Sequence, residues 1–165
     1  MSSNIRKMKK SDALEVGSTE MSRVAKVLIE SLADTYSLYL KTQNYHWNVE
    51  GAKFYAVHNL TETHYLNMQG AIDILAERIR ALGFYTPGSY RQFDALSSIK
   101  TPVDHPVTDD ELIRELSEDH MQLAQRLQCH IELAEEENDQ PTADLLTERR
   151  SFHEKAAWMF RSICK

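Results

Sequence analysis

Two pairs of residues with metal-binding side chains lie within one long segment of the chain. His58 and Glu62 are 4 residues apart, and so are Asp73 and Glu77. Residues at this spacing lie one turn apart on the same face of an α-helix, so each pair can direct two side chains at one ion. A solvated acidic helix face is the alternative interpretation of either pair taken alone.

The distance between the pairs excludes a single site within one chain. Asp73 follows Glu62 by 11 residues, which is about 16 Å along a helix. This spacing is also close to three whole turns, so both pairs lie on nearly the same face. If two copies of the segment crossed antiparallel about a two-fold axis, His58 would lie opposite Glu77, and Glu62 opposite Asp73. Two-fold symmetry would then create two identical sites with ligands from both chains.

The residue types at this predicted contact suit a particular metal. Gly70 lies near the axis and would let the two backbones approach closely. Carboxylates with a minority of imidazoles favour iron over zinc, because a closed zinc site would recruit thiolates; manganese and zinc are competitors. His46 precedes His58 by 12 residues across a short turn, which brings it into reach of the same site. A core histidine with satisfied hydrogen bonds is the alternative interpretation of His46.

The elements that must position these residues are helices. Apolar residues at three- and four-residue steps predict a helix over about 19–48, ending before Gly51, and a second from Phe54 to Gly83. Residues 83–107 contain three prolines and predict a long crossover with one short helix at about 90–97. Thr108 and Glu111 have capping-box spacing at the start of a third helix, and Pro141 suits the first turn of a fourth. This order predicts an all-α, ferritin-type four-helix bundle with a long crossover between the second and third helices.

Length and composition set the domain organisation. The chain has 165 residues, of which 42% are hydrophobic, which is enough for one domain with a real core. We expect a bundle over 18–165 preceded by a flexible basic tail over 1–17. No apolar signal segment or membrane span is predicted, and Cys129 and Cys164 have no metal-type spacing. These features favour a soluble cytoplasmic protein with reduced thiols, whose role the sequence leaves open.

Charge separates the body of the chain from its N-terminus. With 25 acidic and 19 basic residues the net charge is −6, so the folded body should repel nucleic acid. The cluster Arg6, Lys7, Lys9 and Lys10 is the exception. An oligomer that displays many such tails would bind DNA by multivalency, whereas a solubilising disordered end is the alternative.

The pattern around the candidate ligands resembles that of one known family. His46-Trp47-Asn48-Val49, Gly51, Phe54, His58 and Glu62, followed by Asp73 and Glu77-Arg78, are similar to the Dps family of mini-ferritins over about residue 20 to the C-terminus. The resemblance implies a hollow shell of twelve identical subunits that oxidises Fe²⁺ at inter-subunit ferroxidase centres, preferably with hydrogen peroxide rather than oxygen, and stores ferric mineral. It also implies protection of DNA, and the alternative function is that of a nucleoid-associated, DNA-compacting protein acting through the tail.

The resemblance assigns roles to individual residues. His46, His58 and Glu62 would come from one chain, and Asp73 and Glu77 from its two-fold mate. Members often have Asp where this chain has Glu62, and the added methylene changes the reach of one carboxylate. Ordinary ferritins use a Glu-x-x-His motif, and no Glu precedes any of the 7 histidines by three residues.

Several other residues have two interpretations. Trp47 is either a sacrificial radical trap beside His46 or a core residue, and Trp158 is expected in the core. By the resemblance, acidic residues near the start of the fourth helix line a three-fold pore for iron entry, whereas the helix dipole alone also favours acids there; they are Asp139, Asp144 and Glu148. The remaining histidines are expected to be exposed or to cap helices; they are His64, His105, His120, His130 and His153.

Overall fold

Four long helices and one short helix make up the structure. The computed structural model describes residues 21–102 and 108–163. The helices are α1 (Arg23–Asn48), α2 (Phe54–Ala81), α3 (Tyr90–Leu96), α4 (Asp109–Glu136) and α5 (Gln140–Ile163). The described ranges contain no strand, so the predicted all-α class is confirmed. The predicted tail with its four basic residues, His105 and Cys164 lie outside the described ranges.

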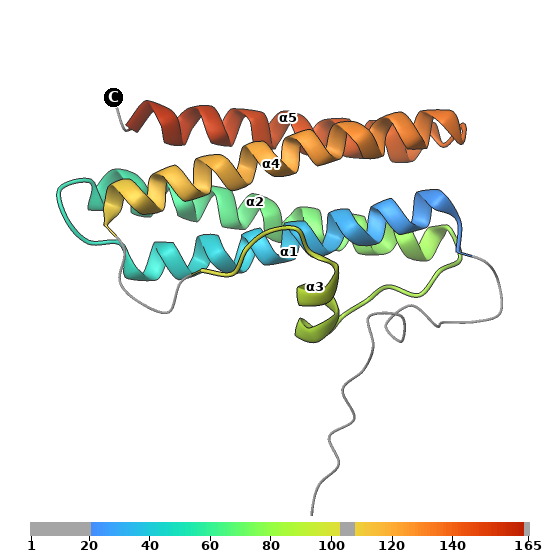
Figure 1. The fold of residues 1–165 in the computed structure, drawn as a ribbon, viewed down its shortest axis with the longest axis horizontal. Helices are drawn as coiled ribbons and strands as arrows, with labels where there is room; N and C mark the ends of the chain where they lie inside the picture. Colours follow the sequence, from blue (N-terminus) through green and yellow to red (C-terminus); the bar gives the residue numbers. More distant parts are fainter. Residues whose placement is uncertain (1–20, 103–107, 164–165) are drawn as a thin grey trace, which may run out of the picture.

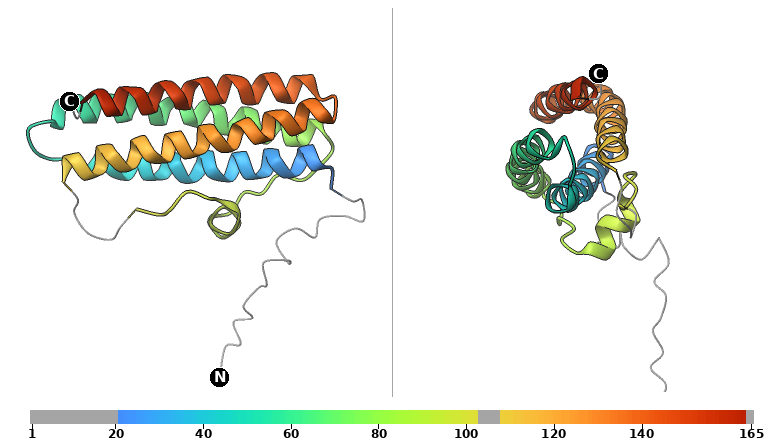
Figure 2. Two further views of the ribbon diagram at one scale, coloured as in Figure 1. Left: turned by 45° about the horizontal axis from the view of Figure 1, so that its top comes forward. Right: turned by 90° about the vertical axis from the view of Figure 1, so that its left-hand side faces the viewer.

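The topology is that of a four-helix bundle with one long crossover. The pair α1–α2 and the pair α4–α5 are each joined by a short turn, and the crossover that carries α3 runs along the outside of α1 (Figure 1). The end view shows the four long helices around one centre, with α3 outside them (Figure 2). No described helix is long and apolar enough to cross a membrane.

Helix ends follow the local signals of the sequence. The Thr108 side chain accepts from the Glu111 backbone at 3.3 Å, and the Glu111 carboxylate accepts from the Thr108 backbone at 2.9 Å, so the predicted capping box is present. The first helix begins at Arg23 rather than 19, because the Ser22 side chain caps it by accepting from the Ala25 backbone. Gly51 has φ of +104°, which the reversal between α1 and α2 requires.

Apolar side chains from all four long helices fill the centre of the bundle. The largest fully buried ones are Leu28, Leu32, Leu38, Met68, Leu75, Ile79, Leu112, Ile113, Leu116, Leu123, Leu127 and Phe160. Their three- and four-residue spacing along each helix is the pattern that predicted the helices. Cys129 is a free, exposed thiol away from this core.

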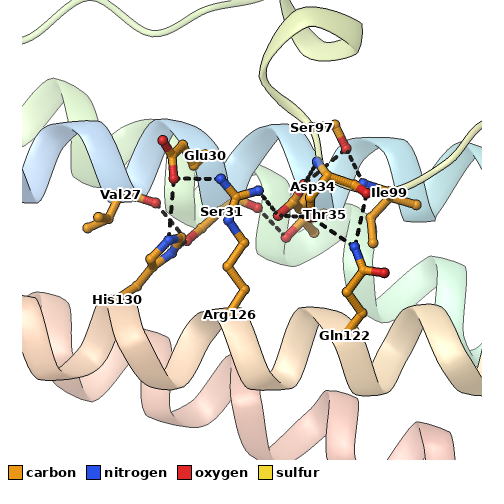
Figure 3. A network of polar contacts seen from close by, with 11 residues as sticks. Val27, Glu30, Ser31, Asp34, Thr35, Ser97, Ile99, Gln122, Arg126 and His130 are labelled. Carbon is orange, nitrogen blue, oxygen red and sulfur yellow. Dashed lines mark hydrogen bonds and ion pairs between the residues drawn. The ribbon is translucent and has the colours of Figure 1, made fainter.

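One buried carboxylate attaches the crossover to the bundle (Figure 3). Asp34 on α1 is fully buried and accepts hydrogen bonds from the side chains of Ser97 and Ser98 and from the Ser98 backbone. Arg126 on α4 donates to Asp34 at 2.7 Å and to Glu30 at 2.6 Å. The end of α3 is therefore fixed to α1 and α4 by a polar network in which a buried charge is paired.

Candidate metal centre

The turn between α1 and α2 brings two histidines together. His46 lies in the last turn of α1 and His58 in the second turn of α2. Their rings are stacked, with centroids 3.9 Å apart and planes 19° from parallel. His46 is buried and His58 is partly buried, and the Phe54 ring also stacks on His58. The structure thus places side by side two residues that the sequence assigned to one site.

Hydrogen bonds indicate which nitrogen of each ring carries a proton. Nδ1 of His46 lies 2.9 Å from the carbonyl oxygen of His58, and Nδ1 of His58 lies 3.1 Å from the carbonyl oxygen of His46. A carbonyl oxygen only accepts, so each Nδ1 carries a proton and donates it. In a neutral imidazole the lone pair is then on Nε2. Metal-binding histidines are commonly oriented by such a contact of the other nitrogen, so both rings fit a metal.

The carboxylates of the predicted site lie along the same helix but not together. Glu62, Asp73 and Glu77 are all exposed on α2. Within 21–102 and 108–163, no three His, Cys, Asp or Glu side chains gather into a group that could hold a metal. A single chain therefore brings His46 to His58, with Glu62 one turn further along, and leaves Asp73 and Glu77 apart. The inter-chain site stays a prediction.

Both tryptophans are exposed in the single chain, although core positions were considered for them from the sequence. Trp158 is 58% exposed, so its predicted place in the core is wrong. It lies between the buried pair Ala156–Ala157 and Phe160 in sequence, but on the opposite side of α5. Trp47 is 64% exposed in the single chain, which excludes core packing as its role there. Its role as a radical trap stays a prediction.

The three acidic residues near the start of α5 differ in their surroundings. Asp139 accepts from the Thr142 backbone at 3.1 Å, as a helix cap does, and pairs with Arg78 at 2.6 Å. Burial alone would raise the pKa of Asp139, but the hydrogen bonds from Thr142 and the charge of Arg78 hold it below its usual value. The helix-terminus interpretation thus accounts for Asp139. Asp144 and Glu148 are exposed, and their pore role stays a prediction.

Four histidines expected at the surface or at caps are instead buried, so that prediction is wrong. His64 of α2, His120 of α4 and His153 of α5 meet in the bundle, with centroids of His64 and His120 5.5 Å apart and those of His120 and His153 5.1 Å apart. Nδ1 of His120 lies 2.8 Å from Nδ1 of His153. His130 is buried separately, with Nδ1 2.8 Å from the Ser31 hydroxyl.

The core cluster of His64, His120 and His153 is poorly solvated. Burial, and secondarily Lys155, lower the pKa of His64 to about 4. Burial and the neighbouring histidine lower the pKa of His120 well below its usual value, and burial followed by Arg149 does the same for His153. One ring nitrogen of each residue is buried without a hydrogen-bond partner. All three rings are therefore neutral near pH 7, because burial disfavours the charged form of a histidine.

A signal for the core cluster was available in the sequence. His64 lies at helical steps from Thr61 and Met68, and both of these residues are buried on the inward side of α2. His120 and His153 occupy equivalent places in the stripes of α4 and α5. Position along the stripe, rather than residue type, predicts their burial.

Known proteins have sequences similar to that of this chain. The ferritin-like domain family matches residues 25–165. An uncharacterized low temperature-induced protein of Nostoc sp. is 39% identical over 153 residues, which cover 91% of this chain and 86% of the relative. DNA protection during starvation protein 2 of Bacillus anthracis is 31% identical over 141 residues, covering 86% of this chain and 96% of the relative.

Solved structures agree with the sequence matches. A Dps protein from Bacillus brevis superposes with a TM-score of 0.83 at 30% identity, covering 86% of this chain and 95% of that chain. A Dps protein from Vibrio cholerae O1, described as a member of a broad superfamily of ferritin-like diiron-carboxylate proteins, gives a TM-score of 0.81 at 27% identity and covers 100% of this chain and 98% of that chain. With the bundle topology and the family match, these similarities show that the chain belongs to the ferritin-like family and, within it, to the Dps-type mini-ferritins.

Proposed function

We propose that this protein is a ferroxidase and iron store, which binds Fe²⁺ as a substrate between two copies of the chain and oxidises it with hydrogen peroxide or oxygen. The ligands are His46, His58 and Glu62 of one copy and Asp73 and Glu77 of the other. The observation that carries the proposal is the reciprocal contact of His46 and His58, which leaves a lone pair on Nε2 of both rings.

The surface of α2 supports a contact with a second copy. Leu66 and Ile74 are 52% and 54% exposed. Leu66 lies between the two ligand pairs in sequence, and Ile74 directly follows Asp73. Apolar side chains of this size on a helix that also carries exposed acids favour burial against a partner. An antiparallel copy of α2 would cover these residues and bring the two ligand pairs together.

Each group has a defined part in the chemistry. The carboxylates supply the negative charge that offsets Fe²⁺ and stabilises Fe³⁺ more strongly, so binding itself favours oxidation. The backbone carbonyls keep the imidazoles oriented during the valence change. We further propose that the dimers assemble into a closed shell of twelve copies with acidic pores. Iron would pass Asp144 and Glu148 in these pores, and ferric mineral would accumulate in the interior.

Mixed assemblies test the inter-chain site. His58→Ala and Asp73→Ala each damage both sites of a homodimer, but a mixed dimer has one site with both lesions and one with neither. We expect mixed assemblies to recover Fe²⁺ oxidation that neither parent shows, measured by the absorbance of ferric iron. If mass spectrometry confirms mixing and no activity returns, the site is not shared between chains.

Protection of DNA follows from the same reaction, because it consumes Fe²⁺ and peroxide together. Curated relatives from Bacillus anthracis and Brevibacillus brevis are named as DNA protection proteins. Direct DNA binding through Arg6, Lys7, Lys9 and Lys10 is a separate proposal about residues outside the described ranges. Gel shifts of the intact chain and of a chain lacking residues 2–17, at low and moderate salt, test it: tail-dependent, salt-sensitive retardation supports binding.

A further inference from the structure

A continuous row of tyrosine rings runs from the histidine pair to the surface of α3. The His46 ring lies 5.2 Å from Tyr65, Tyr65 lies 6.3 Å from Tyr39, Tyr39 lies 5.9 Å from Tyr36, and Tyr36 lies 6.1 Å from Tyr90, all between ring centroids. Tyr90 is 72% exposed in the single chain. These four residues, Tyr36, Tyr39, Tyr65 and Tyr90, are called the tyrosine row below.

The row crosses three helices, so no single helical repeat explains it. Tyr36 and Tyr39 belong to α1, Tyr65 to α2 and Tyr90 to α3. The Phe93 ring stacks on Tyr36 with centroids 4.4 Å apart and holds α3 against α1. The Asp34 network fixes the other end of α3 (Figure 3). The contact between Tyr36 and Tyr90 thus depends on the crossover being docked.

Polar groups lie beside the row at two places. Glu62 precedes Tyr65 by three residues on α2, and the rings of Tyr36 and Tyr90 are in edge contact. Burial, followed by the contact with Tyr90, raises the pKa of Tyr36. Tyr36 is therefore a neutral phenol that loses its proton when it loses an electron. Packing alone would be served as well by phenylalanine, whereas one-electron oxidation of a ring at mild potential requires the phenol hydroxyl.

We propose that the tyrosine row is an electron relay that completes the reduction of hydrogen peroxide when only one Fe²⁺ occupies the metal centre. The proposal rests on the proposed function of that centre. Reducing peroxide to two waters takes two electrons and two protons. One Fe²⁺ supplies one electron and becomes Fe³⁺.

Tyr65 supplies the second electron. The oxygen–oxygen bond of peroxide breaks, and its two oxygens leave as water after taking up the proton that Tyr65 releases and one proton from solvent. Tyr39 then transfers an electron and a proton to the oxidised Tyr65. Tyr36 reduces Tyr39 in the same way, and Tyr90 reduces Tyr36, so that Tyr90 is left oxidised. A second Fe²⁺ in solution then reduces Tyr90, which takes a proton from water. The sum is two Fe²⁺ oxidised per peroxide, with no hydroxyl radical released.

Rapid mixing of the assembled protein tests the relay. The protein receives less than one Fe²⁺ per site without oxygen, is mixed with one equivalent of hydrogen peroxide, and is frozen for electron paramagnetic resonance. A parallel sample contains a nitroso spin trap, and its labelled peptides are identified by mass spectrometry. We expect a tyrosyl signal and an adduct on Tyr90 in the unmodified chain.

Substitutions along the row identify the route. Tyr39→Phe and Tyr36→Phe keep the ring and remove the hydroxyl, and neither residue is a proposed ligand. Both should lose the adduct on Tyr90, while Tyr39→Phe leaves oxidation of Tyr65. Tyr55→Phe and Tyr85→Phe, which change tyrosines outside the row, should keep the full adduct on Tyr90.

The outcomes separate failure of the relay from failure of the metal centre. The relay is wrong, and the ferroxidase stands, if the unmodified chain consumes Fe²⁺ but shows no tyrosyl signal or carries the adduct on Trp47 alone. The same conclusion follows if the Tyr39→Phe variant still carries the adduct on Tyr90. If the unmodified chain does not consume Fe²⁺, the proposed function fails and the relay falls with it.

Discussion

The histidine pair and the core cluster hold imidazoles in opposite states. His46 and His58 are close to the surface, and each Nδ1 donates to a backbone carbonyl. His64, His120 and His153 lie in the bundle, and each has a ring nitrogen without a partner. In the histidine pair, both Nδ1 atoms have hydrogen-bond partners without a metal, and both Nε2 atoms still offer lone pairs. The cluster is unsatisfied, yet it does not form a ligand group.

The difference shows that a group of histidines is not by itself a metal site. A histidine ligand needs an accessible lone pair on one ring nitrogen and a hydrogen bond to the other nitrogen that holds the ring in place. In the core cluster the closest nitrogens, those of His120 and His153, are 2.8 Å apart and share one proton between them. We infer that the pair serves iron chemistry and that the cluster affects stability, and the following experiments test this division.

The largest expected effect is on iron oxidation. His58→Ala should slow Fe²⁺ oxidation by at least about 10- to 100-fold, the loss that even outer partners of a metal site can cause. Because His58 is partly exposed, the melting temperature of the variant should differ little from that of the unmodified chain. The matched substitution in the cluster, His64→Leu, should keep the unmodified rate. Equal rates in His58→Ala and the unmodified chain would remove the pair from the metal centre.

The second effect is acid destabilisation from the cluster. The pKa of His64 is about 4 in the folded chain against 6.5 for the free side chain, so the unfolded chain binds more protons between these values. Stability is then complete above pH 6.5 and falls as the pH is lowered toward 4. His64 alone should cost about 2 kcal/mol by pH 5. Urea denaturation at pH 7.5 and 5 measures this loss, and a smaller loss in His64→Leu identifies the residue.

A smaller effect is expected from the same residue at neutral pH. His64→Leu removes a buried nitrogen that has no partner and keeps an apolar side chain against Phe152 and Phe160. Relief of the desolvation cost should make the free energy of unfolding equal to or about 1 kcal/mol above that of the unmodified chain at pH 7.5. A loss of several kcal/mol would mean that the ring has a stabilising partner.

The smallest effect is on the orientation of the pair. The Thr61 hydroxyl lies 3.3 Å from Nδ1 of His46, behind the shorter contact with the His58 carbonyl. Thr61→Val keeps the shape and removes the hydroxyl, so Fe²⁺ binding should weaken a few-fold. Anaerobic titration measures the affinity. Thr63→Val, which changes an exposed threonine on the same helix, is the control and should bind as the unmodified chain does.

The sequence predicted the fold better than the surroundings of single residues. Apolar periodicity and the Thr108–Glu111 capping box located the four long helices, and α2 ends at Ala81, two residues before the predicted Gly83. The approach of His46 to His58 was also predicted, because a short turn between two helices allows little else. Burial of His64 was missed because histidine was treated by its usual preference rather than by its place on the stripe. Contacts to a second copy lie beyond what one folded chain contains.

The Asp34 network also determines how the molecule comes apart. Its single carboxylate joins α1 to Ser97 and Ser98 and to Arg126, segments that are 63 to 92 residues away along the chain. Losing one of these contacts leaves the others holding a buried charge that is less well compensated, so they are lost together. We therefore expect the described part of the crossover, which carries α3, to detach as one cooperative unit in a local unfolding event separate from melting of the four long helices. Proteases would meet this segment first, and cleavage there would report how often Asp34 is released.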